Sequence, residues 1–288
     1  MRNDFAVFIL SHGRAETVIT AKTLEKQGYS GSWYIVIDNE DEKQGEYKKA
    51  YGERVIVFDK KEAARTTDTL DNFRERNVVV FARNQVNEIA KQRGFKHYLV
   101  LDDDYDRIVF RYAKGKILHE QKILQIEKVF EVYIRFLEVT NAVTVAFAQN
   151  GDFIGGVNSG VFKRGITRKA MNSFFCRADK PLKFYGRINE DVTMYSLAGI
   201  RGELVFTTTH VAISQTETQQ NQGGLTDAYL ELGTYIKSFY SVIACPSCVK
   251  VAMLKSGIDR LHHNVNWKYC AVKILNERLK KPSSRDSV

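Results

Sequence analysis

Residues 98–106 read Tyr98-Leu99-Val100-Leu101-Asp102-Asp103-Asp104-Tyr105-Asp106, an apolar run that passes directly into three consecutive carboxylates. The run Tyr98–Leu101 has the length and character of a buried strand. In open α/β sheets, ligands bind beyond the carboxyl ends of the strands, where these three aspartates would lie. Adjacent carboxylates repel one another, so we expect a bound cation to offset them, and their oxygen atoms suit Mg²⁺ or Mn²⁺. The alternative is a solvated acidic turn.

The residues before this stretch alternate between strand and helix signals. Strands are predicted at Ala6–Leu10, Trp33–Ile37, Arg54–Phe58 and, less clearly, Val78–Phe81. Helices are predicted at Ala15–Gln27 and Arg83–Arg93, each followed by a glycine. Short strands separated by helices are typical of βαβ units. We therefore predict an α/β fold with a mixed, mainly parallel sheet flanked by helices.

Polar residues follow the other predicted strands and should meet the aspartates at one edge of the sheet. Ser11-His12-Gly13-Arg14 follows the first strand, and its backbone N–H groups and arginine are suited to a pyrophosphate or a base. Asp38 follows the second strand and is suited to hydrogen bonds from a ribose or a base. Arg83 and Asn84 open the helix before the acidic triplet. Together these residues predict a nucleotide pocket with a metal.

The second half of the chain is less regular. A helix with one apolar face is predicted at Lys122–Leu137 and a strand at Val143–Ala148, and Gly151–Phe162 has strand character despite its glycines. Glu190–Ala198 is predicted as a helix and Glu203–Thr208 as a strand. Two more helices are expected near the end, at Ala228–Val242 and Cys270–Leu279.

The composition is that of an ordinary globular protein of 288 residues, with 44% hydrophobic and 27% charged residues. No run of 18 apolar residues predicts a membrane span, and Phe5–Leu10 is too short for a secretory signal. We therefore expect a cytoplasmic protein without a membrane partner. Four cysteines in a chain of this length form no disulfide framework, which agrees with a reducing compartment.

The net charge of +9 is concentrated in the second half. Residues 1–150 carry 24 Lys and Arg against 23 Asp and Glu, whereas residues 151–288 carry 19 against 11. A basic half beside a neutral one indicates a polyanionic partner, with nucleic acid the first candidate and solubility the alternative explanation.

The order of these motifs resembles the GT-A glycosyltransferase fold and its DxD motif. The resemblance implies that Asp104 binds the metal, that Asp102 contacts the metal or the ribose of a nucleoside diphosphate-sugar, and that Asp103 lies with them at the donor. It divides the chain into a catalytic domain, 1–225, and a helical extension, 226–288, packed on the same domain. Within that domain, 1–110 would hold the nucleotide-sugar and 111–225 the acceptor.

Two further features of this resemblance concern the reaction. Asn189-Glu190-Asp191 is similar to the E-D pair of inverting GT-A enzymes, which makes Asp191 the candidate general base and Glu190 the second candidate. Acidic residues that merely favour a helix N-terminus are the alternative. His210 follows the Glu203–Thr208 strand, where many GT-A enzymes supply a further ligand to the metal or the diphosphate; a structural histidine is the alternative.

The motif set resembles the TET-associated glycosyltransferase family of bacteriophages, which is implicated in adding sugars to hydroxymethylated pyrimidines in DNA. The motifs are S-x-G-R at 11–14, D-D-D-Y-D at 102–106, G-G-x-N-S-G at 155–160, E-D at 190–191, Q-G-G at 222–224 and R-L-H-H-N-V-N-W at 260–267. The resemblance implies a nucleoside diphosphate-sugar donor, first of all a UDP-sugar, and DNA containing 5-hydroxymethylcytosine or a similar base as acceptor. A phage-encoded enzyme would act in the host cytoplasm.

Several residues are predicted to contact the acceptor. Glycines allow a backbone to approach a substrate closely. A tight β-hairpin would explain the glycines of the 155–160 motif equally well. Basic side chains after residue 162 would hold DNA phosphates, or form a solvated face. The predicted acceptor residues are Gly155, Gly156, Asn158, Gly223, Gly224, His262 and His263, and the predicted phosphate contacts are Lys163, Arg164, Arg168 and Lys169.

Other functions remain open from the sequence. The acceptor could be a polysaccharide, a lipid or a protein; the chain could bind DNA without turnover; or it could be a nucleotidyltransferase, which shares the metal-carboxylate chemistry. No protein partner is predicted. Cys245 and Cys248 have the spacing of zinc ligands but lack a matching second pair, so packed thiols are the preferred interpretation.

Overall fold

The parallel part of the sheet is built around β1 (Phe5–Leu10), whose six side chains are all buried. A strand covered on both faces is a continuous apolar run, which is why it is visible in the sequence. In this computed structural model, which describes residues 1–215, 236–256 and 258–280, β1 lies between β2 (Ser32–Asp38) and β4 (His97–Asp102). β2 in turn pairs with β3 (Val55–Phe58), and all three pairings are parallel. The predicted strands in this region are confirmed apart from Val78–Phe81.

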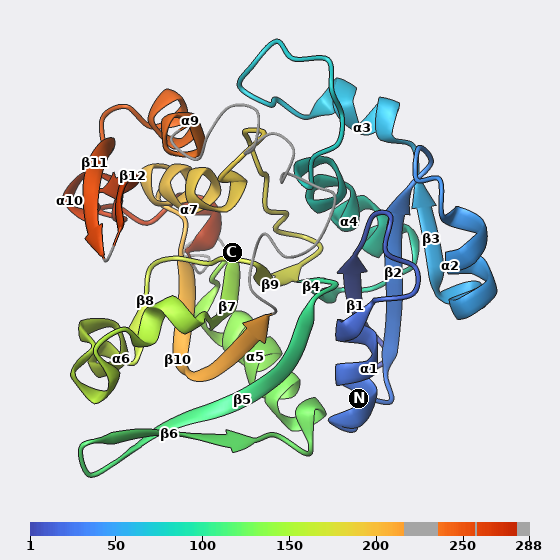
Figure 1. Cartoon of the computed structure of the whole chain (residues 1–288), viewed down its shortest axis with the longest axis horizontal. Helices are drawn as coiled ribbons and strands as arrows, with labels where there is room; N and C mark the ends of the chain where they lie inside the picture. Colours follow the sequence, from blue (N-terminus) through green and yellow to red (C-terminus); the bar gives the residue numbers. More distant parts are fainter. Residues whose placement is uncertain (216–235, 257, 281–288) are drawn as a thin grey trace, which may run out of the picture.

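The remaining strands turn this parallel core into a mixed sheet with the order β3-β2-β1-β4-β9-β7-β10-β5-β6 (Figure 1). β9 runs antiparallel to β4 and β7, β10 runs parallel to β7, and β5 and β6 extend the edge as an antiparallel hairpin. This confirms the predicted α/β fold class and is consistent with a Rossmann-like GT-A fold. The bounds are β5 (Tyr105–Lys114), β6 (Ile117–Lys122), β7 (Thr144–Ala148), β8 (Ile166–Thr167), β9 (Ser173–Arg177) and β10 (Val205–Gln215), with β8 paired to β10.

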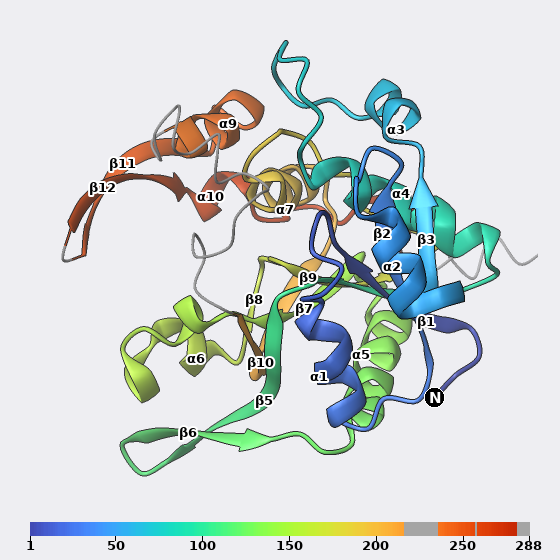
Figure 2. The same cartoon turned by 45° about the vertical axis from the view of Figure 1, so that its right-hand side comes forward.

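Helices cover both faces of the sheet (Figure 2). One apolar core lies between the sheet and α1, α2 and α5, and a second lies between the sheet and α3, α4 and α7. α5 contributes the predicted apolar face, since Phe130, Tyr133 and Leu137 are all buried. None of the described helices combines the length and the hydropathy needed to span a bilayer. The bounds are α1 (Ile19–Lys26), α2 (Gln44–Tyr51), α3 (Lys60–Thr66), α4 (Val80–Gln92), α5 (Ile126–Thr140), α6 (Gly160–Arg164) and α7 (Glu190–Ile200).

Two strand predictions are wrong. Val78–Phe81 contains the start of α4, and Val80 and Phe81 pack against the sheet; so short an apolar run does not distinguish a strand from a buried helix end. Gly151–Phe162 forms 3₁₀ turns at Asn150–Phe153 and Gly156–Asn158 followed by α6. Gly155 and Gly156 adopt φ values of 93° and 59°, a left-handed conformation that ends any extended segment.

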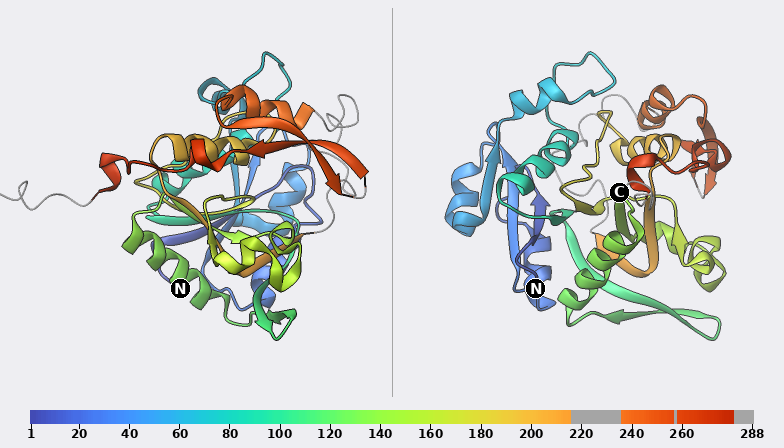
Figure 3. Two further views of the ribbon diagram at one scale, coloured as in Figure 1. Left: turned by 90° about the vertical axis from the view of Figure 1, so that its left-hand side faces the viewer. Right: turned by 180° about the vertical axis from the view of Figure 1, so that it is seen from behind.

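The C-terminal part is only partly helical. α9 (Ile236–Ala244) confirms the end of the predicted Ala228–Val242 helix, while 228–235 lie outside the described residues. β11 (Val249–Ser256) and β12 (Ile258–Val265) then form a hairpin that the sequence did not predict. The predicted helix Cys270–Leu279 is wrong. The short helix α10 (Trp267–Cys270) already ends at the first residue of the predicted helix, and only a 3₁₀ turn, Glu277–Leu279, follows it. Figure 3 shows the hairpin on the far side of the molecule from α5.

α7 anchors this C-terminal segment through a glycine contact. A Cβ atom placed on Gly199 would lie 1.7 Å from the backbone oxygen of Cys270. We expect Gly199→Ala to lower the free energy of unfolding by roughly 3 kcal/mol, because the overlap with rigid backbone forces α10 away from α7. Urea denaturation of the variant measures this loss. Gly45→Ala in α2, where a Cβ meets nothing within 4 Å, should instead leave stability unchanged or slightly raised, and equal effects of the two substitutions would contradict the packing argument.

A buried ion pair joins three distant segments. Arg187 Nε and Nη2 donate to Asp71 Oδ2 and Oδ1 at 2.7 and 2.9 Å, and Tyr240 of α9 donates to the same carboxylate at 2.6 Å. Burial raises the pKa of Asp71, but the hydrogen bonds from Arg187 and Tyr240 outweigh it and lower the pKa. The loop before α4, the loop before α7 and α9 are thereby held in one arrangement.

We expect Arg187→Met to cost about 3 kcal/mol of stability, because it leaves the Asp71 carboxylate buried without its cation. Chemical denaturation at neutral pH is the measurement. Because the pKa of Asp71 is lowered in the folded state, the difference between variant and wild type should shrink as the pH falls through that pKa. Arg177→Met removes a more exposed pair with Asp179 and should cost less than about 1 kcal/mol; a similar loss in both variants would refute the special role of Arg187.

Candidate active site

The carboxyl ends of β1, β2 and β4 lie side by side, as the parallel pairing requires. Leu10 is paired with Asp102 and with Val36, so the segments that follow the three strands meet at one edge of the sheet. A cavity of about 590 Å³ opens there, and α4, α7, α9 and the β11–β12 hairpin close it. We call it the carboxylate cavity. Among the predicted residues, its lining includes Ser11, His12, Arg14, Asp38, Arg83, Asp102, Asp103, Asp104, Glu190, Asp191, His262 and His263.

Asp103 fixes the loop after β1. Its carboxylate accepts hydrogen bonds from Ser11 Oγ at 2.5 Å and from Arg14 Nη1 at 3.0 Å. The buried Tyr47 hydroxyl shares a hydrogen bond with Ser11 Oγ and accepts one from the Arg14 N–H. The Gly13 N–H donates to Asp41, so this part of the loop is also held within the protein. The predicted donor loop is therefore rigid and tied to the acidic turn.

Asp102 and Asp104 are the two aspartates of the turn with capacity for a ligand. Asp102 accepts hydrogen bonds from Arg83 Nη2 at 3.3 Å and from the Tyr105 hydroxyl at 3.1 Å, and its side chain stays 27% exposed. Asp104 Oδ1 is buried and has no hydrogen-bond partner among the described residues. Burial, together with repulsion from Asp102 and Asp103, raises the pKa of Asp104 to about 7. A buried carboxylate oxygen without a partner is the environment that a cation would relieve.

Arg83 connects the acidic turn to α7. Its Nε lies 3.0 Å from Glu190 Oε1 while its Nη2 contacts Asp102. The guanidinium is fully buried beside the rings of Phe174 and Phe184, with its carbon 4.9 and 5.8 Å from their centres. Arg83 Nη1 is buried and has no hydrogen-bond partner in the described structure. The Arg83 guanidinium thus contacts both Asp102 and Glu190, and its Nη1 remains available to donate to an anionic ligand.

Asp191 differs from Glu190 in its surroundings. Both are 6% exposed at the start of α7, and burial raises the pKa of both carboxyl groups. Glu190 is paired with Arg83, whereas the Asp191 carboxylate accepts its hydrogen bond from the N–H of the next residue, Val192, at 2.7 Å. Of the two, Asp191 is therefore the better placed to accept a proton from a ligand.

The end of β2 is held by a histidine and a lysine. Asp38 accepts from His12 Nδ1 at 2.9 Å and lies 3.3 Å from the ammonium of Lys60, which is buried. Burial raises the pKa of Asp38, but His12 and Lys60 together lower it. The carboxylate is thus held in its charged form at the cavity wall.

Several predicted residues lie outside the carboxylate cavity. Asn84 points away from the cavity, and its amide bonds the backbone of Phe184 and the hydroxyl of Thr67. His210 lies on β10 with its ring against Phe162 and is exposed, so the structure does not place it with the aspartates. Gly155, Gly156 and Asn158 form the turn before α6 and line no part of this cavity, because the segment is not the predicted strand. Gly223 and Gly224 lie outside the described residues.

The cavity also includes residues that the sequence did not single out. Lys60 follows β3, Tyr195 lies on the second turn of α7, and Lys237 reaches the cavity from α9. Asn189 precedes α7 with φ of 57°, and its side chain donates to the backbone oxygen of Lys237 at 2.7 Å. The position of Lys60, two residues after the predicted Arg54–Phe58 strand, was a usable signal, whereas the positions of the other residues depend on tertiary packing.

The three C-terminal cysteines are packed together behind α7. Cys245, Cys248 and Cys270 are each buried, and Leu197 and Val242 pack against them. Across residues 1–215, 236–256 and 258–280, no group of three or more His, Cys, Asp or Glu side chains is arranged to hold a metal ion by itself.

The sequence matches a family model described as TET-Associated Glycosyltransferase over residues 5–224. No curated protein matches it. Among solved structures, a crystal structure of a mycobacterial protein is similar with a TM-score of 0.49 and 9% sequence identity, covering 92% of this chain and 87% of that chain. The family match takes in the acidic turn, Arg83 and the E-D pair, whereas His262 and His263 lie beyond it.

Proposed function

Because the chain belongs to the TET-associated glycosyltransferase family, we propose that it moves a sugar from a nucleoside diphosphate donor to a hydroxymethylated pyrimidine in DNA. One observation carries the proposal. The acidic turn and the E-D pair, 86 residues apart between Asp104 and Glu190, line the same cavity, and Arg83 contacts both groups. Glycosyl transfer by direct displacement needs groups that bind a diphosphate and a base in one cavity, and these residues are proposed to supply them.

The donor is proposed to be a UDP-sugar whose nucleotide lies at the ends of β1 and β2. The Ser11–Arg14 loop and Asp38 form that wall, and both are held rigidly by neighbouring side chains. The diphosphate would lie near Arg83, whose Nη1 is the buried donor without a partner. A fixed guanidinium stabilises a diphosphate as negative charge develops on it.

We propose that Asp104 and Asp102 hold Mg²⁺ or Mn²⁺. Two carboxylates suffice, because these ions complete their coordination with water and with substrate phosphates. The unpartnered Asp104 Oδ1 and the raised pKa of Asp104 fit such an ion. When bound, the cation would act as a Lewis acid that offsets charge on the departing diphosphate.

The E-D pair is proposed to activate the acceptor. Asp191 accepts the proton of the acceptor hydroxyl as its oxygen forms a bond to the anomeric carbon. The bond from that carbon to the diphosphate oxygen breaks, and the nucleoside diphosphate leaves with the electron pair. Glu190 acts by positioning Arg83, since it pairs with the Nε of that guanidinium.

The DNA acceptor is supported by the charge distribution as well as by the family. Residues 151–288 carry 19 Lys and Arg against 11 Asp and Glu, and two of these cations, Lys169 and Lys237, line the carboxylate cavity. Incubation of the protein with DNA containing 5-hydroxymethylcytosine and a panel of nucleoside diphosphate-sugars tests the proposal. Mass spectrometry of the digested nucleosides should show a hexose or pentose adduct; adduct on a polysaccharide or protein and none on any hydroxymethylated DNA would overturn the acceptor assignment.

A further inference from the structure

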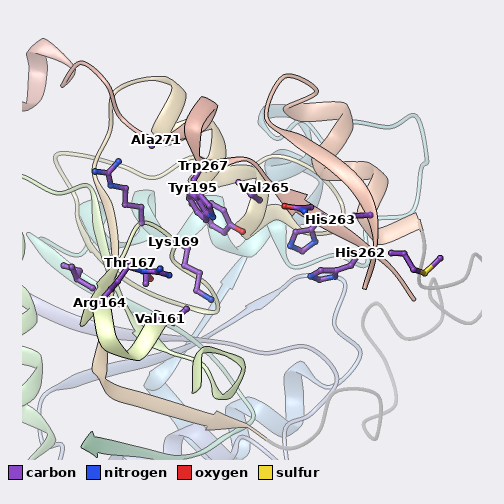
Figure 4. A pocket seen from close by; sticks show the side chains of 15 residues that line it. Val161, Arg164, Thr167, Lys169, Tyr195, His262, His263, Val265, Trp267 and Ala271 are labelled. Atoms are coloured by element: carbon purple, nitrogen blue, oxygen red, sulfur yellow. The ribbon is translucent and has the colours of Figure 1, made fainter. Parts of the chain in front are cut away.

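A second cavity, of about 740 Å³, lies beside the carboxylate cavity (Figure 4). Its walls come from α6 and the segment after it, from Tyr195 of α7, and from the β11–β12 hairpin with α10. We call it the basic cavity, because Arg164, Arg168 and Lys169 line it, and its lining includes no Asp or Glu among the residues that the structure describes.

The charge of the basic cavity is available to a ligand. Lys169 forms an ion pair with Asp152, but Arg164 and Arg168 are exposed and form no ion pair with any residue that the structure describes. Most other arginines of the described chain are paired with carboxylates, as Arg83 and Arg187 are. The guanidinium groups of Arg164 and Arg168, with no carboxylate in the described part of the same lining, match a phosphodiester.

The two cavities share a wall. Lys169, Tyr195, His262 and His263 line both of them. Figure 4 shows these four side chains on α7, on β12 and in the segment after α6. The two cavities therefore border each other at these four residues, and Asp191 lies in the lining of the neighbouring carboxylate cavity.

The basic cavity also has an aromatic surface. The Trp267 ring stacks on Tyr195, with centres 5.5 Å apart and planes at 20°. Tyr195 is buried, whereas Trp267 is 40% exposed and bounds the cavity. An exposed indole beside unpaired arginines is the combination with which proteins bind single-stranded nucleic acid.

We propose that the basic cavity is the acceptor site and that it binds an unstacked nucleotide of the DNA strand. Arg164 and Arg168 hold the phosphates on either side of this nucleotide, and a base stacks on Trp267. The hydroxymethyl group extends between the side chains that line both cavities, toward Asp191. This inference rests on the proposed function for the identity of the acceptor. A base within a duplex must leave its stack to reach such a site.

Tryptophan fluorescence provides a direct test, because the chain has two tryptophans and Trp33 is buried under Arg54 in β2. A short single-stranded oligodeoxynucleotide with one central 5-hydroxymethylcytosine should quench the emission of the wild type and of Trp33→Phe. The oligodeoxynucleotide should leave the emission of Trp267→Phe unchanged. Trp267→Ala should bind the oligodeoxynucleotide about ten-fold more weakly than the wild type does. Equal quenching in Trp267→Phe and wild type would overturn the proposal.

The arginines are tested by the salt dependence of the same binding. Arg164→Ala and Arg168→Ala should each reduce the slope of log K against log salt by about 0.7, as expected for one lost phosphate contact on a single strand. Arg135→Ala is the matched control, because Arg135 is exposed on α5 and lines neither cavity. Unchanged slopes for Arg164→Ala and Arg168→Ala, or an equal change for Arg135→Ala, would refute the phosphate assignment.

Donor hydrolysis without DNA separates this inference from the proposed function. The Trp267 and arginine variants should hydrolyse the nucleoside diphosphate-sugar at the wild-type rate while they lose transfer to DNA. If the wild type transfers sugar to DNA and the Trp267, Arg164 and Arg168 variants transfer it equally well, the acceptor site alone is overturned. A wild type that neither binds nor hydrolyses any donor would instead overturn the proposed function, whatever its behaviour toward DNA.

Discussion

Asp104→Asn is expected to lower the rate of sugar transfer about a thousand-fold and to abolish the effect of Mg²⁺ or Mn²⁺ on donor binding. The substitution keeps the shape of the side chain but removes the charge that would bind the cation. Several kcal/mol of transition-state stabilisation depend on that cation, and each 1.36 kcal/mol corresponds to a factor of ten in rate. Steady-state transfer and donor titration with and without added metal provide the measurement.

The same variant should fold at least as well as the wild type in metal-free buffer. Asp104 Oδ1 is buried without a hydrogen-bond partner in the described structure, so a neutral amide removes an unfavourable buried charge. Thermal melting checks this expectation. Asp106→Asn, an exposed carboxylate two residues further on, should affect neither the transfer nor the melting temperature. Full transfer by Asp104→Asn, or by the wild type with excess chelator, would remove the metal from the proposal.

Asp191→Asn is expected to lower kcat by a factor of about a hundred to ten thousand while the KM for the donor changes little. Proton transfer by a positioned side chain contributes an acceleration of this size, and an amide cannot accept the proton. Asp191 lines the cavity without an ion pair of its own in the described structure, so its loss should leave the donor wall intact.

Glu190→Gln distinguishes the two candidates for the base. Glu190 pairs with Arg83, so its loss should loosen the guanidinium and raise the KM for the donor more than it lowers kcat. A larger fall in kcat for Glu190→Gln than for Asp191→Asn would show that Glu190 is the base. Circular dichroism and melting of both variants control for local unfolding of α7.

The sequence was most informative where the fold repeats a simple local rule. β1, β2 and β4 are covered on both faces, so each is a continuous apolar run, and the polar residues that follow them lie at a common edge because the strands are parallel. This is why Ser11, Asp38 and Asp102 could be assigned to one cavity from the order of the residues alone.

Such local rules do not predict the directions of side chains or the contacts between segments that are distant in the sequence. Arg83 and Asn84 are neighbours in the sequence, yet successive residues of a helix point in different directions, so Arg83 reaches the carboxylates and Asn84 bonds Phe184. Likewise His210 and His263 are both histidines on late strands. Which of them meets the cavity depends on how the β11–β12 hairpin docks on the rest of the protein, and this docking follows from tertiary packing.

The walls of the carboxylate cavity come from parts of the chain that are made at different times. The acidic turn and α7 leave the ribosome before Lys237, His262 and His263 do, because synthesis proceeds from the N-terminus. A nascent chain that has reached β10 already contains the acidic turn, Arg83 and the E-D pair, but it lacks the residues of α9 and β12 that complete the cavity. Catalytic competence would therefore be acquired late in translation, when the hairpin docks on α7.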